Sequence, residues 1–159
     1  MRRKAAYLAT AVVVLSTALN LLHTASHAGQ HVMSLPAWQL AYIALVIYAA
    51  PVVAATLFWS RFRLIATWLL FASMAGSFVF GLVFHFIVPG VDNVFTLEPG
   101  AWRITFLVTA VLLSLVQVIG ILTGLWTARR ISRTSPDLTD KPFAGGLSSS
   151  QRGSGSESR

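Results

Sequence analysis

The residues with the clearest chemical potential in this 159-residue chain are its four histidines. Three of them, His23, His27 and His31, follow one another at intervals of four, and His85 lies far along the sequence. In a helix, residues four apart share one face, with a rise of about 6 Å and a drift of about 40° at each step. Neighbouring members of the series can therefore share one ion, whereas all three cannot easily do so.

This spacing predicts a metal site if His85 lies on a helix that faces the first three. His23 with His27, or His27 with His31, would then join His85 and supply three nitrogens. Asp92, in the loop beyond His85, would add a carboxylate oxygen. Three imidazoles with a carboxylate or a water suit zinc, copper or iron.

Two other interpretations use the same residues. A b-type haem could lie between two helices, with His27 and His85 as its axial ligands. Alternatively, the histidines bind nothing and form polar contacts between helices, while Asp92 serves only as a turn residue. The sequence leaves these alternatives open. The chain has no cysteine, which excludes thiolate ligands and cysteine nucleophiles.

Four apolar stretches must position these residues. The chain is 55% hydrophobic and only 11% charged, with a mean hydropathy of +0.70, which is typical of a membrane protein. The stretches, at about 5–29, 37–59, 64–88 and 101–126, are each long enough to cross a hydrocarbon core of about 30 Å as a helix. We therefore predict an all-α integral membrane protein whose transmembrane domain, 1–130, is a four-transmembrane-helix bundle.

The basic residues predict the orientation of this bundle. Lys and Arg precede the first stretch, separate the second from the third and follow the fourth, whereas Arg103 stands alone on the other side. The positive-inside rule then places both termini in the cytoplasm of a protein in the plasma membrane, with all the histidines toward the outer face. Residues 131–159, rich in Ser, Gly and Arg, are predicted to form a disordered cytoplasmic tail.

The first stretch has a second interpretation, as a cleaved signal peptide. Its basic start, MRRK, and the small residues around His27 would suit one. The apolar run of 5–22 is longer than the usual signal-peptide core of about 7–15 residues. The length favours a retained span.

Small and polar residues predict how the helices pack. Pro51 should bend the second span, and the pair Gly120 and Gly124 should allow another helix close to the fourth. Asn20 continues the histidine face, and Gln117 is expected to form a hydrogen bond between helices. These faces place the first, third and fourth spans in the bundle interior, with the second span more peripheral.

Composition also narrows the function. The net charge is +7 and the pI is near 11.2. The basic residues flank the apolar stretches instead of gathering on a soluble surface, so no nucleic-acid partner is predicted. We find no nucleophile motif, no phosphate-binding loop and no carboxylate within the spans, which disfavours an enzyme. The prediction is a membrane protein that binds a metal ion or haem at the outer ends of the first and third spans. The alternative is a non-catalytic accessory or assembly subunit, with other membrane subunits or copies of itself as partners.

Overall fold

The computed structural model describes residues 2–32, 35–90 and 92–132, and all regular elements within them are helical. They are α1 (Arg2–Gly29), α2 (Ala37–Tyr42), η1 (Ile43–Ala49), α3 (Ala50–Leu57), α4 (Arg63–Leu82), η2 (Val83–Ile87) and α5 (Arg103–Ser132), where η1 and η2 are π-helical. Four helical stretches are long and apolar enough to cross a membrane, as predicted. The tail from 133 onward lies outside the described residues, so its disorder stays a prediction.

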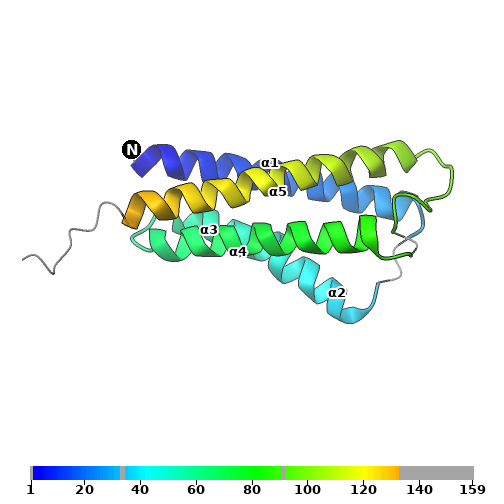
Figure 1. Cartoon of the computed structure of the whole chain (residues 1–159), viewed down its shortest axis with the longest axis horizontal. Helices are drawn as coiled ribbons and strands as arrows, with labels where there is room; N and C mark the ends of the chain where they lie inside the picture. Colours follow the sequence, from blue (N-terminus) through cyan, green and yellow to red (C-terminus); the bar gives the residue numbers. More distant parts are fainter. Residues whose placement is uncertain (1, 33–34, 91, 133–159) are drawn as a thin grey trace, which may run out of the picture.

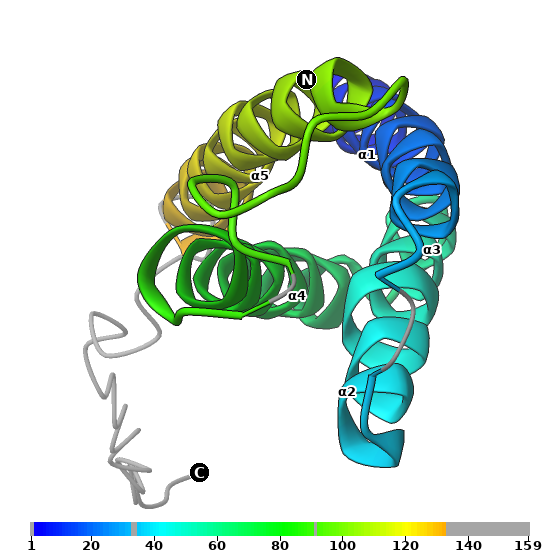
Figure 2. The same ribbon diagram turned by 90° about the vertical axis from the view of Figure 1, so that its right-hand side faces the viewer.

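The four spans run side by side along the long axis of the molecule (Figure 1). The start of α1 and the end of α5 lie at one end, and the loop between η2 and α5 lies at the other (Figure 1). Seen along this axis, the spans follow one another around a ring in the order α1, α5, α4 and α3 (Figure 2). Helix α5 packs against both α1 and α4, and α3 packs against α4 and α1.

Small residues set the distance between α4 and α5. A Cβ atom on Gly120 would stand 2.6 Å from Cγ of Met74, and one on Gly124 would stand 3.2 Å from the backbone of Phe71. The two helices can approach this closely only because both positions are glycine. Large apolar side chains such as Leu45 and Ile104 point outward and are exposed, as expected for a surface that meets lipid.

The second span is not one continuous α-helix. Pro51 has no backbone N–H to donate into the preceding turn, and the seven residues before α3 are wound as the π-helix η1. The bend predicted at Pro51 therefore takes the form of a widened helix. The outer segment, α2, leans away from the other spans (Figure 2).

A tight cap ends α1 directly after its last buried histidine. The N–H of His31 donates to the carbonyl of Ala28 at 3.1 Å, and the N–H of Val32 donates to the carbonyl of His27 at 3.1 Å. This is the Schellman pattern, and it places His31 in the left-handed region, with φ 59°. The regular face of the helix therefore stops before His31.

The loop after η2 folds back over the end of the bundle. The N–H of Val94 donates to the carbonyl of His85 at 2.9 Å, and the Asn93 side chain donates to the carbonyl of Val88 at 3.0 Å. Val94 and Leu97 are buried in one apolar cluster with Phe106. These contacts hold Asp92 beside the histidines.

Candidate metal centre

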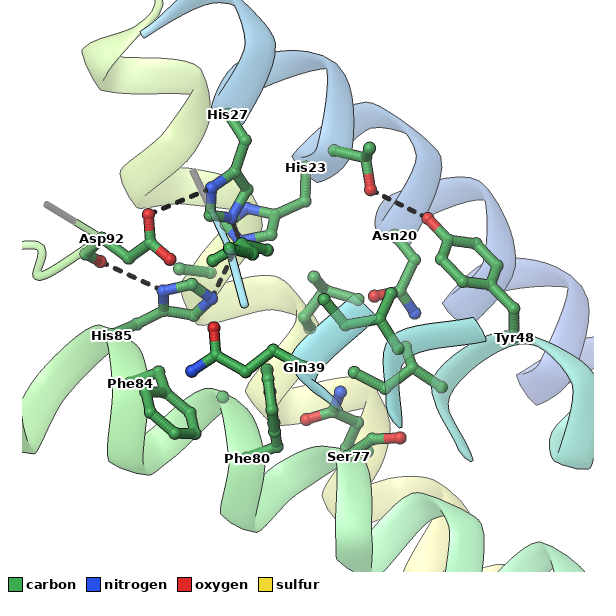
Figure 3. Close-up of a pocket in the computed structure, with 18 of the residues that line it drawn as sticks. Asn20, His23, His27, Gln39, Tyr48, Ser77, Phe80, Phe84, His85 and Asp92 are labelled. Atoms are coloured by element: carbon green, nitrogen blue, oxygen red, sulfur yellow. Dashed lines mark hydrogen bonds and ion pairs between the residues drawn. The ribbon is translucent and has the colours of Figure 1, made fainter. Parts of the chain in front are cut away.

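Three of the four histidines meet between α1 and η2 (Figure 3). Nε2 of His23 lies 3.2 Å from Nε2 of His27 and 3.2 Å from Nε2 of His85. One ligand atom from each of the three residues lies within 4.8 Å of the other two. Nitrogens around a tetrahedral ion with bonds of about 2.0–2.1 Å stand about 3.3 Å apart. The two short distances therefore match those of ligands that share one metal ion.

Each of these imidazoles has an oxygen beside its other ring nitrogen. Nδ1 of His23 lies 2.7 Å from the hydroxyl of Thr109, and Nδ1 of His85 lies 3.1 Å from the backbone carbonyl of Asp92. Nδ1 of His27 lies 3.4 Å from a carboxylate oxygen of Asp92, close enough for an ion pair, although the two atoms are not aligned for a hydrogen bond. Such outer oxygens orient metal-binding histidines in proteins.

These oxygens determine which ring nitrogen carries the proton. A backbone carbonyl only accepts, so Nδ1 of His85 is its donor. The Thr109 hydroxyl donates to the carbonyl of Thr105 at 2.7 Å, and it therefore accepts from Nδ1 of His23. In the neutral rings, Nε2 of His23 and Nε2 of His85 then both present lone pairs, 3.2 Å apart. Two acceptors at this distance are stabilised by a cation between them.

The predicted site residues have different places in this arrangement. His23, His27 and His85 form the group, whereas Asp92 contributes its oxygens to the Nδ1 side of two imidazoles rather than to the Nε2 side. Asp92 therefore lies beside the group, and its place as a direct ligand stays a prediction. The structure does not bring His31 to the group, because it is exposed and lies beyond the end of α1.

The site is built into the packed part of the bundle. His23 and His27 are 6% and 9% exposed. Phe106 of α5 is fully buried, and its ring centroid lies 4.7, 4.8 and 5.4 Å from those of His23, His27 and His85. The Phe106 side chain therefore packs against all three imidazoles.

Sequence reasoning missed both Phe106 and Thr109 as neighbours of the histidines. A single aromatic or threonine within an apolar span carries no signal of its own. In this protein, both acquire a role because α5 packs against α1 beside the histidines.

A cavity of about 130 Å³ adjoins the three histidines. Its lining includes Asn20 of α1, Gln39 of α2, Ser77 of α4 and Gln117 of α5, together with apolar side chains. We refer to it as the chamber. Figure 3 shows the carboxamide of Gln39 pointing toward His85 from the chamber side. The imidazole group is therefore packed against Phe106 and also faces a cavity that several polar side chains line.

We compared the chain with models of protein families, with curated proteins and with solved structures, and none of the three comparisons gave a match.

Proposed function

We propose that this chain is an integral membrane protein that binds one divalent transition-metal ion through Nε2 of His23, His27 and His85. The observation that carries the proposal is the convergence of three Nε2 atoms whose rings each face an oxygen through Nδ1. This pattern gives both the ligands of the ion and the contacts that orient them.

Zinc fits this ligand set best, and copper or iron is the alternative. Imidazole nitrogens suit all three metals. The short nitrogen–nitrogen distances of 3.2 Å favour a compact tetrahedral arrangement, which is the usual geometry of protein-bound zinc. Three neutral histidines leave the ion with its full positive charge, and the Asp92 carboxylate beside His27 offsets part of it.

A haem held by His27 and His85 is less well supported. Axial ligands must lie on opposite faces of the porphyrin, but the centroids of these two rings are 5.4 Å apart and His23 stands against both. The chamber of about 130 Å³ is also smaller than the roughly 300–1,000 Å³ of sites for larger organic ligands.

The accessory-subunit alternative interprets the same histidines as contacts between helices. It accounts for a link between α1 and η2. A hydrogen bond between two imidazoles, however, needs a proton on one of the two facing Nε2 atoms. The Thr109 hydroxyl and the Asp92 carbonyl each accept from an Nδ1 atom, so the one proton of each neutral ring, His23 and His85, lies on Nδ1. Neither Nε2 atom can then donate to the other. The metal proposal explains this arrangement directly.

Metal analysis of the detergent-purified protein tests the proposal. We expect about one equivalent of metal per chain, and its loss in His27→Ala and in His85→Ala. His31→Ala is the matched control, because His31 is the remaining histidine and lies outside the group. Stoichiometric binding that survives both changes would refute the site. Protein without metal or pigment that purifies with a larger membrane complex would support the accessory alternative.

We further propose that both termini are cytoplasmic and that the site lies near the outer face of the plasma membrane. The support is the distribution of Lys and Arg. Because the chain lacks cysteine, single-cysteine variants report sidedness cleanly. A membrane-impermeant maleimide added to intact cells should label Thr96→Cys but not Ser60→Cys. Labelling of Ser60→Cys alone would show that the protein has the opposite orientation.

A further inference from the structure

Two buried glutamine side chains line the chamber, and no hydrogen bond joins either of them to another described residue. Gln39 and Gln117 are 7% and 4% exposed, and neither side chain forms a hydrogen bond within residues 2–32, 35–90 and 92–132. They come from the second and fourth spans. In the apolar interior of a membrane protein, unsatisfied amides are costly. Two such groups facing one cavity therefore indicate that the cavity holds polar molecules.

Other polar groups of the chamber retain unused hydrogen-bonding capacity. Asn20 uses its amide nitrogen on the carbonyl of Ser16 at 3.0 Å, so its carbonyl oxygen remains an acceptor. Ser77 donates its proton to the carbonyl of Ser73 at 2.7 Å, and its oxygen can still accept. The chamber is large enough for several water molecules or one small ligand.

The chamber extends to the outside of the bundle between the first and second spans. Thr24 and Leu40 line it and are also exposed. The Thr24 hydroxyl lies 2.9 Å from that of Tyr48, and this contact joins α1 to η1 at the edge of the chamber.

We infer that the metal position is an open coordination site whose fourth ligand is a water or small anion held in the chamber, with Gln39 as its hydrogen-bond donor. This inference rests on the proposed function and deepens it. A structural zinc site has four protein ligands, whereas a site with three protein ligands keeps a position for an exchangeable molecule. The described histidine group provides three. Gln39 acts as a positioning residue that orients the exchangeable ligand.

Cobalt substitution with azide as the probe tests this inference. Azide is a small anion that changes the visible spectrum of Co²⁺ when it enters the coordination shell. We expect a saturable spectral change in the Co²⁺-loaded full-length protein in detergent. Gln39→Leu should keep about one equivalent of Co²⁺ but weaken azide binding by about tenfold, because a hydrogen bond to a charged ligand is lost.

The control is Gln30→Leu, which makes the same chemical change outside the chamber and should leave azide affinity unchanged. One equivalent of Co²⁺ with a spectrum that azide does not alter would overturn the inference and leave the proposed metal site intact. Equal azide affinity in Gln39→Leu and Gln30→Leu would overturn the role of Gln39. Failure to bind Co²⁺ at all would instead overturn the proposed function, and the inference with it.

Discussion

The threonine behind His23 gives the sharpest test of how this site is organised. The Thr109 hydroxyl lies 2.7 Å from Nδ1 of His23, and Thr109 is 2% exposed. Thr109→Val keeps the branched shape of the side chain but removes this acceptor. The buried N–H of His23 then loses its partner, at a cost of about 1–3 kcal/mol. Loss of an outer hydrogen bond of this type lowers metal affinity by about 10–100-fold, which corresponds to about 1.4–2.7 kcal/mol.

Helix α5 itself supplies the matched control. Thr123 is 5% exposed, and its hydroxyl bonds the carbonyl of Ile119 at 2.8 Å, just as that of Thr109 bonds Thr105 at 2.7 Å. Thr123→Val therefore repeats the same local change away from the histidines.

Competition with a chromophoric chelator measures the zinc affinity of both variants. We expect the stoichiometry to stay near one in each, with weaker affinity in Thr109→Val alone. Affinity within about twofold of wild type in Thr109→Val, or an equal loss in Thr123→Val, would refute the reasoning.

Three further predictions follow from the same contacts. Asp92→Asn removes the charge beside Nδ1 of His27 but keeps the backbone carbonyl that contacts His85, so zinc affinity in the chelator assay should fall by about tenfold; an unchanged affinity would exclude a role for the carboxylate. Gly124→Val should lower the thermal unfolding midpoint in detergent, because a Cβ added there would stand only 3.2 Å from the backbone of Phe71 and overpacking costs about 1–3 kcal/mol. A midpoint equal to wild type would contradict the close approach of α4 and α5. Zinc at 100 times its dissociation constant should stabilise the wild-type protein by about 2.7 kcal/mol, and His85→Ala should lose that stabilisation in the same melting experiment; equal stabilisation of this variant would place the metal elsewhere.

The group formed by His23, His27 and His85 was only partly predictable. The four-residue spacing predicted that His23 and His27 share one face, and they do, because both lie within the regular part of α1. The same rule extended the series to His31, where it does not hold, since the helix has already ended in a left-handed cap. Periodicity describes a helix but does not mark its last residue. The cap depends on backbone hydrogen bonds that the sequence pattern does not reveal.

The position of His85 shows a similar division. The sequence placed it near the end of the third span, but its direction depends on η2, where the helix widens into π geometry. Such π-helical turns often occur at functional sites. The loop behind it brings Asp92 to the Nδ1 side of the imidazoles rather than to the Nε2 side. The place of Asp92 thus depends on how this loop folds back onto η2, which no spacing in the sequence specifies.

What the sequence determined by itself is that the chain forms four helices long and apolar enough to cross a membrane. Long runs without charge leave the backbone no option in lipid except to satisfy its hydrogen bonds within each helix, and this requirement is local. The tertiary structure decided which side chains form the site. Thr109 and Phe106 reach the histidines through the packing of α5 against α1. Gln39, on the second span, lines the chamber beside them. Contacts between distant segments depend on how the helices pack against one another, and no periodicity within a single helix encodes them.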